Sequence, residues 1–298
     1  MAERSAKRVT RHSVEYNVTE HCNLSCYGCD HASPLLPDRF VAVEDFARDL
    51  TALARVFHAE QLRILGGEPL LHPDLLQFLR EGRRTGVADS IWIYTNGVLL
   101  HTMPAELWEL IDGLHISVYP GVRRRLDDAE CERLCKAHGI KLEVEHYTKF
   151  TRTLINQQIR ERKLVRAIYR HCEMAAECNT VHDGRFYKCA PAPFMGPRLA
   201  QQGIDFNHRA QDSVALRDNP TLQKDMDRYF NANTPLAACS YCLGTCGPLV
   251  PHRQLDRKGC EAWLTEDNSA DIKLVRDQLI GKHWFLRGVG KLRRLLNS

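Results

Sequence analysis

Short apolar runs alternate with longer amphipathic stretches between Val14 and about His146. The apolar runs predict buried parallel strands at 13–18, 61–65, 90–94, 113–118 and 141–145. The stretches between them have helical periodicity and predict helices at 43–57, 73–83, 104–111 and 123–138. This alternation indicates an α/β fold built from successive βα units.

The candidate site loops follow the ends of these predicted strands. They contain Cys22, Cys26 and Cys29 after the first strand, Gly66, Gly67, Glu68 and Pro69 after the second, Thr95, Asn96 and Gly97 after the third, and Tyr119 and Pro120 after the fourth. Right-handed βαβ connections bring such loops to the carboxyl edge of a parallel sheet. We therefore expect one catalytic face rather than isolated turns.

The region after Phe150 has a different pattern. Basic residues between Arg152 and Arg170 predict a helix whose charged face is in solvent. Asp183-Gly184, between β-forming residues, predicts a hairpin. A further helix is predicted at 221–230, and an amphipathic helical tail that packs on the main domain is predicted from 271 to 296.

Composition describes an ordinary globular protein with an unusual number of cysteines. The 298 residues are 44% hydrophobic and 26% charged, which suffices for one large α/β domain with a small appendage. The net charge of +4 is too mild to indicate nucleic-acid binding. We find no secretory signal and no apolar run of membrane-spanning length, so we expect a cytoplasmic protein without a membrane partner. Disulfides are disfavoured in the cytoplasm, so the twelve cysteines are expected to include metal ligands.

The loop containing Cys22, Cys26 and Cys29 is short enough for all three thiols to reach one inorganic centre. Three thiolates are one fewer than a structural zinc ion or a closed iron–sulfur cluster takes. A metal site with an open position indicates chemistry rather than a structural role.

This cysteine loop, followed by Gly-Gly-Glu-Pro after the next strand, resembles the radical S-adenosylmethionine (SAM) superfamily over roughly residues 14–150. The resemblance implies a partial (β/α)6 TIM-like barrel in which the three cysteines hold a [4Fe-4S] cluster. It further implies that the fourth iron binds the amino and carboxylate groups of SAM, whose cleavage yields a 5′-deoxyadenosyl radical. A flavodoxin- or ferredoxin-type protein would supply the electron.

The same resemblance assigns roles to the remaining residues of the site. The glycines would let backbone approach the cofactor, Glu68 would bind its ammonium group, and Pro69 would fix the turn. Asn96 and Ser117 are candidate cofactor contacts; for Ser117, a strand-end serine bonded to backbone is the alternative. The family usually has an aromatic residue just before the third cysteine. Gly28 holds that place here, and Tyr27, one step earlier, is our candidate for the adenine contact.

The C-terminal third resembles the twitch domain of this superfamily, a small unit of a β-hairpin plus a helix. The resemblance implies that Cys172, Cys189, Cys239 and Cys242 bind an auxiliary [4Fe-4S] cluster; a structural zinc site is the alternative. We divide the chain into a barrel core (12–150), a basic connecting helix (151–170), a twitch domain (171–262) and a C-terminal helical tail (263–298).

Five cysteines remain. Cys131 and Cys135 lie one turn apart on a predicted helix and are expected to be buried. Cys178 is an alternative to Cys172 as a ligand, and Cys260 has no assignment. Cys246 lies between two glycines four residues after Cys242, and we expect its loop to bring a hydrogen-donating thiol to the barrel mouth.

Three reactions compete, and we expect the first of them. The first is epimerisation of a sugar or aminocyclitol carbon with Cys246 as hydrogen donor, as in aminoglycoside epimerases of the neomycin C epimerase type in antibiotic biosynthesis. The second is oxidation of an alcohol with the auxiliary cluster as electron acceptor, as in 2-deoxy-scyllo-inosamine dehydrogenase. The third is ribosomal-peptide maturation. An iron–sulfur carrier or a zinc-bound interaction module is the alternative to an enzyme.

The substrate is constrained from two sides. Glu143 and Glu145 share one face of the fifth strand and would suit a cationic aminoglycoside. The basic helix would instead suit a phosphorylated or nucleotide-linked sugar.

Overall fold

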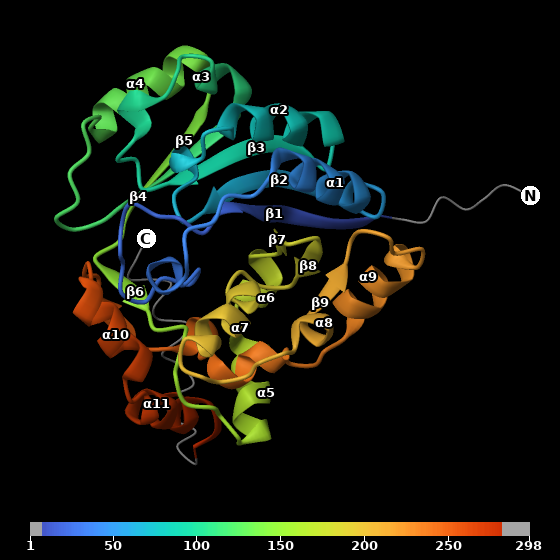
Figure 1. Ribbon diagram of the computed structural model, residues 1–298, viewed down its shortest axis with the longest axis vertical. Coiled ribbons are helices and arrows are strands. Elements are labelled where there is room, and N and C mark those ends of the chain that lie inside the picture. The colour runs from blue at the N-terminus through green and yellow to red at the C-terminus, as the bar shows by residue number, and fades with distance from the viewer. Residues whose placement is uncertain (1–7, 282–298) are drawn as a thin grey trace, which may run out of the picture.

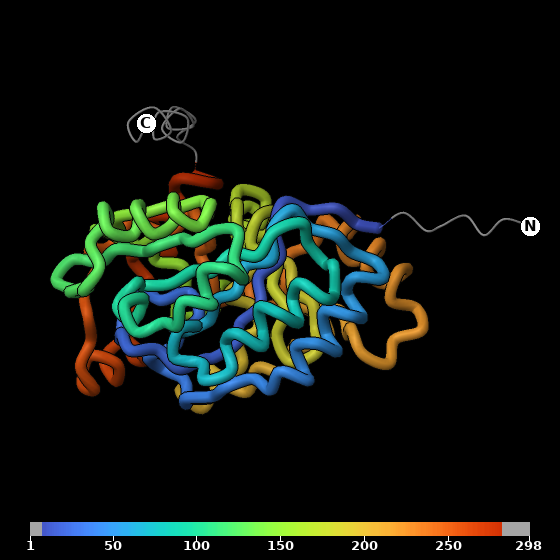
Figure 2. Tube along the Cα trace, turned by 90° about the horizontal axis from the view of Figure 1, so that it is seen from above, coloured from blue at the N-terminus to red at the C-terminus, as the bar shows by residue number. Residues whose placement is uncertain are grey.

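A computed structural model describes residues 8–281, and in it the first half of the chain forms a parallel sheet with helices on one face (Figure 1). The strands are β1 (Val9–Thr19), β2 (Phe57–Gly66), β3 (Ala88–Thr95), β4 (Gly113–Val118) and β5 (Lys141–His146). The α-helices between them are α1 (Val43–Ala54), α2 (Leu75–Thr85), α3 (Leu107–Leu110) and α4 (Asp128–His138). Seen from above, these helices succeed one another across the sheet in chain order (Figure 2). The predicted α/β alternation is confirmed.

Both faces of β1 are buried, but they carry different side chains. Val14, Tyr16 and Val18 join the main apolar core beneath the helices, and the Tyr16 ring packs edge-on against Phe46 of α1 with centroids 4.6 Å apart. Glu15 and Asn17, on the opposite face, are buried as well. Successive side chains of a strand point to opposite faces. The helix side is therefore an apolar core, and the other side has polar groups.

The sheet continues beyond β1 into the C-terminal half. Its strand order is β5-β4-β3-β2-β1-β7-β8-β9, with β7 (Thr180–His182) parallel to β1. β8 (Arg185–Tyr187) and β9 (Ser213–Ala215) follow antiparallel. Asp183 and Gly184 have φ of 47° and 70° between β7 and β8, as a two-residue hairpin turn requires, so the predicted hairpin is confirmed. Within residues 8–281, β5 and β9 form the two edges, and the barrel is open.

The other C-terminal elements lie on the far side of the sheet from α1–α4 (Figure 1). A separate antiparallel pair joins β6 (Lys149–Thr151) to β10 (Leu249–Pro251). The α-helices are α5 (Arg162–His171), α6 (Met174–Glu177), α7 (Ala192–Ala200), α8 (Arg209–Asp212), α9 (Leu222–Asn231), α10 (Arg257–Thr265) and α11 (Ser269–Ile280). The 3-10 helices of the chain are η1 (Ser33–Leu35), η2 (Pro69–Leu71), η3 (Leu100–Thr102), η4 (Ala237–Tyr241) and η5 (Gly244–Cys246). No helix within residues 8–281 is both long and apolar enough to cross a membrane.

The basic helix is shorter than predicted, because α5 begins at Arg162 and not at Arg152. The preceding segment is bound to the η4 region instead: Ile155 N donates to Tyr241 O and Ile159 N to Ser240 O, at 3.1 and 2.8 Å. Basic residues gave a helical pattern there, but these backbone bonds between distant segments hold the chain in another conformation. The part of the predicted C-terminal helical tail that follows residue 281 lies outside the described residues.

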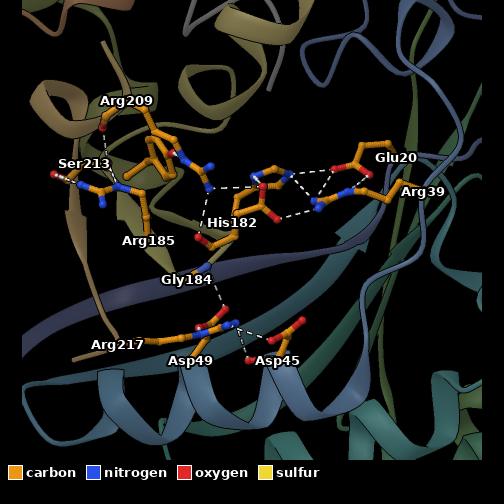
Figure 3. Close-up of polar contacts among 12 residues, drawn as sticks. Glu20, Arg39, Asp45, Asp49, His182, Gly184, Arg185, Arg209, Ser213 and Arg217 are labelled. Atoms are coloured by element: carbon orange, nitrogen blue, oxygen red, sulfur yellow. Dashed lines mark hydrogen bonds and ion pairs between the residues drawn. The ribbon is translucent and has the colours of Figure 1, made fainter. Parts of the chain in front are cut away.

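A network of polar side chains fastens the hairpin to the barrel (Figure 3). Asp49 of α1 is fully buried and accepts hydrogen bonds from Tyr16 Oη (2.8 Å), Arg217 Nε (2.5 Å) and the backbone N of Gly184 (3.1 Å). Removing one partner of such a buried ionic group costs about 3–5 kcal/mol. The two halves therefore have a fixed relation at this contact.

Candidate active site

A cavity of about 790 Å³ lies at the carboxyl edge of the parallel strands. The predicted site residues that line it are Cys22, Cys26, Cys29, Gly66, Gly67, Asn96, Ser117 and Glu145. These side chains come from loops that follow β1, β2 and β3 and from the ends of β4 and β5. The structure thus brings together the loops that the predicted βα alternation placed at the carboxyl edge of the sheet.

The three thiols of the cysteine loop lie close enough to shift one another's pKa. Burial and, to a smaller extent, the neighbouring Cys29 raise the pKa of Cys26 to about 12, against a hydrogen bond from Gln254 that lowers it. Burial likewise raises the pKa of Cys22, and Cys29 and Cys26 add to that rise. Three neighbouring buried thiolates need a compensating positive charge, which a metal centre supplies. The donor set therefore fits a metal cluster at the cavity wall.

The two glycines of Gly-Gly-Glu-Pro approach the start of the cysteine loop. Gly67 N donates to Thr19 O at 2.7 Å, and a Cβ on Gly67 would lie 2.1 Å from His21 O. A Cβ on Gly66, whose φ is 146°, would lie 2.3 Å from Thr19 O. Only glycine permits this approach. The glycines thereby hold the cysteine loop against β2, in addition to lining the cavity.

Glu68 is hydrogen-bonded to the loops around it. It is fully buried, and its oxygens accept hydrogen bonds from Thr95 Oγ1 (2.6 Å), Asn96 N (2.9 Å) and Leu70 N (3.0 Å). Asn96 Nδ2 in turn donates to Asn23 Oδ1 at 2.7 Å. Glu68 therefore connects the loops after β2 and β3, and Asn96 connects them to the cysteine loop. Neither Glu68 nor Pro69 lines the cavity.

Tyr27 points away from the cavity. Its hydroxyl donates to Glu266 at 2.5 Å, the Arg253 guanidinium lies 4.2 Å from its ring centroid, and Trp263 packs against it. The aromatic side chains that do line the cavity include Tyr119 and Phe150. The adenine contact expected of Tyr27 therefore has better-placed candidates on this wall.

Acidic groups face the cavity from two sides. Asp30 lines it, and Asp30 Oδ1 is buried without a hydrogen-bond partner. Burial is the main cause of the raised pKa of Cys29 and of Cys242, and the charge of Asp30 raises both further. Glu145 also lines the cavity and accepts from Tyr147 Oη at 2.5 Å, whereas Glu143 pairs with His115 (3.2 Å) and does not line it.

The sequence model of the radical SAM superfamily matches residues 16–177, which is more than half of the chain. The chain belongs to the radical SAM superfamily. Membership implies a [4Fe-4S] cluster and SAM, and the three thiols at the cavity, one buried and two half-buried, fit that cluster. Cys22, Cys26 and Cys29 would hold it, and the cavity bounded by Gly66, Gly67 and Asn96 would receive SAM.

Curated relatives match only part of this chain. GTP 3′,8-cyclase of Chlorobaculum tepidum is 36% identical over 107 residues, which cover 35% of this chain and 32% of that protein. GTP 3′,8-cyclase of Heliobacterium modesticaldum is 33% identical over 151 residues, covering 45% of this chain and 46% of that protein. The chain thus matches from about a third to just under half of the length of these relatives.

Two solved radical SAM structures resemble the chain over more of its length. One is BtrN in complex with AdoMet and 2-DOIA, with a TM-score of 0.48, 13% identity, and coverage of 73% of this chain and 96% of that chain. The other is SuiB of Streptococcus suis bound to S-adenosylmethionine, with a TM-score of 0.40, 12% identity, and coverage of 76% and 65%.

Four further thiols gather in the C-terminal half of this radical SAM protein. They are Cys172 at the end of α5, Cys189 after β8, and Cys239 and Cys242 in and after η4. Burial raises the pKa of Cys189, and the other three thiols raise it further. Within residues 8–281, no three Cys, His, Asp or Glu side chains lie as close as a single metal ion requires. A four-iron cluster is larger and spaces its ligands more widely than a single ion does.

Of the remaining cysteines, Cys246 lies near this set, since burial raises the pKa of its thiol and the neighbouring Cys172 raises it further. Cys131 and Cys135 are in the main core, so their expected burial is confirmed. Cys178 lies beside Glu15 and Arg63 under the sheet and not with the other three ligands. Cys246 does not line the cavity; its Sγ lies 4.0 Å from Ile168 O, and its side chain packs with the apolar contacts between α5 and α11. Cys260 lies beside the Tyr27 and Trp263 cluster.

Sequence reasoning missed several residues of the site. Asp30 directly follows the third cysteine, and this adjacency was the available signal. His252 and Gln254 contact Cys26 from the other end of the chain, and no local pattern marks them. Tyr119 was placed at the catalytic edge by its position after β4.

Proposed function

We propose that this radical SAM enzyme removes hydrogen from a carbon bearing a hydroxyl or amino group in a small polar ring, a sugar or an aminocyclitol. When bound, the cluster and SAM supply the 5′-deoxyadenosyl radical that takes the hydrogen atom. The single observation that carries the proposal is Asp30, which lines the cavity beside the cysteine loop and whose Oδ1 is buried without a hydrogen-bond partner. A buried acceptor without a partner favours a ligand that brings a hydroxyl or ammonium donor.

We further propose that Cys172, Cys189, Cys239 and Cys242 hold an auxiliary [4Fe-4S] cluster. Support comes from their mutual proximity and from a backbone bond to one of them, since Gly244 N donates to Cys242 Sγ at 3.2 Å. When bound, this cluster would accept the electron that an oxidation releases. A flavodoxin- or ferredoxin-type partner and a cytoplasmic location are part of the same proposal.

Oxidation of the ring carbon is better supported than epimerisation. Epimerisation needs a hydrogen donor at the cavity, and the candidate thiol of Cys246 packs between α5 and α11 instead. In oxidation, the substrate carbon would lose a hydrogen atom, the Asp30 carboxylate would accept the hydroxyl proton, and a cluster held by the four C-terminal cysteines would accept the remaining electron. Epimerisation through Cys246 and peptide maturation remain the alternatives.

The charges of the cavity support a neutral or cationic substrate. Asp30 and Glu145 line it, and Lys149 is the one Lys or Arg among its lining residues in the described chain. The basic side chains of α5 (Arg162, Lys163, Arg166 and Arg170) are exposed and do not line the cavity. A triphosphate would find few cations there. A guanine nucleotide is nevertheless the second candidate, because the curated relatives are named GTP 3′,8-cyclase.

The test is turnover by the anaerobically reconstituted protein under strong reduction. Aminocyclitols and amino sugars deuterated at ring carbons are offered with SAM beside deuterated GTP. We expect deuterium to enter 5′-deoxyadenosine only with an aminocyclitol or amino sugar, together with a ketone product. Deuterium transfer from GTP alone would overturn the proposal.

Two variants separate the roles of the cavity residues. Asp30→Asn is expected to lower turnover about 100-fold while iron content and substrate-independent SAM cleavage stay. Glu143→Gln is the matched control and should retain turnover, because Glu143 does not line the cavity. Cys246→Ala should leave oxidation unchanged; an inverted product that takes hydrogen from solvent and disappears in this variant would instead establish epimerisation.

A further inference from the structure

The segment 252–255, between β10 and α10, runs across the cysteine loop. Tyr27 N donates to Arg253 O at 2.9 Å and Leu255 N to Ser25 O at 2.8 Å, on either side of an antiparallel bridge between Cys26 and Gln254. These two segments are more than two hundred residues apart in sequence. The C-terminal half therefore completes the environment of one proposed cluster ligand.

The Gln254 side chain is oriented by its own backbone partner. Ser25 N donates to Gln254 Oε1 at 2.7 Å, and a backbone N–H can bond only the oxygen end of an amide. The amide nitrogen must then be the other end. It lies 3.2 Å from Cys26 Sγ, to which it donates.

His252 reaches the same sulfur from the neighbouring side. Its Nε2 lies 3.3 Å from Cys26 Sγ and 3.2 Å from Gln254 Nε2. The ring is stacked on Tyr119 with centroids 4.7 Å apart and meets the edge of Phe150. Both aromatic side chains line the cavity, so His252 is held between the cavity wall and the sulfur.

We propose that Gln254, supported by His252, sets the reduction potential of the cluster held by Cys22, Cys26 and Cys29. Reduction places additional negative charge on the cluster and its thiolates. A hydrogen bond donated to a cysteine sulfur stabilises this reduced form more than the oxidised form and so raises the potential. The proposal rests on the superfamily cluster alone and is independent of the substrate and of the auxiliary cluster.

The arrangement makes electron uptake depend on the C-terminal half. Gln254 meets Cys26 only when the segment 252–255 pairs with the cysteine loop. A chain in which that pairing is open would have a cluster that is harder to reduce. Gln254 and His252 are thus positioning residues that act through Cys26 and touch no reacting atom.

The test is a redox titration of the full-length, reconstituted protein, followed by electron paramagnetic resonance. Adding SAM changes the signal of the open cluster and so distinguishes it from any auxiliary cluster. We expect Gln254→Leu to shift the midpoint of the SAM-responsive signal to a more negative potential. At a fixed potential the ratio of reduced to oxidised cluster should fall about tenfold, which corresponds to about 59 mV for one electron.

Matched variants separate tuning from folding. Arg253→Gln changes the same segment at a side chain that faces Tyr27 and should leave the midpoint unchanged. Gln254→Glu keeps the acceptor for Ser25 N but replaces the donor, so it should shift the midpoint in the same direction as Gln254→Leu and serves if that variant does not fold. An unchanged midpoint in either variant with full iron content would overturn the proposal. Absence of a SAM-responsive signal in the unaltered protein would overturn the cluster assignment, and this proposal with it.

Discussion

The two groups of cysteines in this protein are assembled in opposite ways. Cys22, Cys26 and Cys29 come from one loop after β1 and line a cavity. The other four come from the end of α5, the end of β8 and the η4 region, and do not line it. An open loop at a cavity can expose a metal to a ligand, whereas a set drawn from several elements encloses it. This difference is the physical basis for proposing radical initiation at the first group and electron transfer at the second.

The largest effects should follow from removing one ligand of each group. Cys26→Ala is expected to abolish 5′-deoxyadenosine formation, because the remaining two thiols leave the open cluster without its ligand set. Cys239→Ala should keep substrate-independent SAM cleavage and lose substrate oxidation. Each variant should lose about half of the iron, that is about four of eight atoms per chain. The measurements are anaerobic iron analysis and product quantification.

The two outcomes are separable. Loss of SAM cleavage in Cys239→Ala, with the first cluster intact by spectroscopy, would contradict the division of roles. Full iron content in Cys239→Ala would remove the auxiliary cluster from the proposal. Cys260→Ala, on α10, is the matched control and should retain both activities.

The first group was predictable from the sequence because its determinants are local. Spacing within one loop identified Cys22, Cys26 and Cys29, and alternation of apolar runs placed that loop at the strand edge. The glycines of the β2 loop were also found, although one of their partners, Thr19 O, became visible only in the structure.

The environment of the site depends on contacts between distant segments. Gln254 reaches Cys26 because β10 pairs with β6, and no periodicity encodes that pairing. The segment 152–161 is not helical for the same reason, since its backbone bonds to the η4 region. The glycines beside Cys246 do not indicate where its thiol lies, because side-chain packing between α5 and α11 determines the position of that thiol. The domain boundaries and ligand roles inferred by resemblance remain predictions.

An intermediate effect is expected where Gly67 meets the cysteine loop. Gly67→Ala would place a Cβ 2.1 Å from His21 O and 2.7 Å from Glu20 O, both backbone atoms that cannot rotate away. We expect a loss of about 3 kcal/mol or more in the free energy of unfolding, together with weaker retention of the open cluster. Anaerobic urea denaturation of the reconstituted protein measures it.

Gly139→Ala provides the control for backbone strain alone. Its φ of 69° is left-handed, unlike that of Gly67, and a Cβ at Gly139 meets nothing within 4 Å. The expected cost is about 1–2 kcal/mol without any change in the clusters. Equal losses of unfolding free energy in Gly67→Ala and Gly139→Ala would show that the close approach at Gly67 costs no more than left-handed backbone strain does.

The smallest effect should follow from the equivalent change beside the second group. Gly244 has a φ of 55°, and a Cβ there would lie 2.6 Å from Cys172 Sγ. A side chain and not backbone must give way here, so Gly244→Ala should cost about 1–2 kcal/mol, less than Gly67→Ala, and the displaced sulfur belongs to a proposed cluster ligand. It should alter the resonance signal of the auxiliary cluster while the SAM-responsive signal stays unchanged. A change in the SAM-responsive signal would mean that the two cysteine groups are mechanically coupled, and the contrast between a local and an assembled site would then not extend to their function.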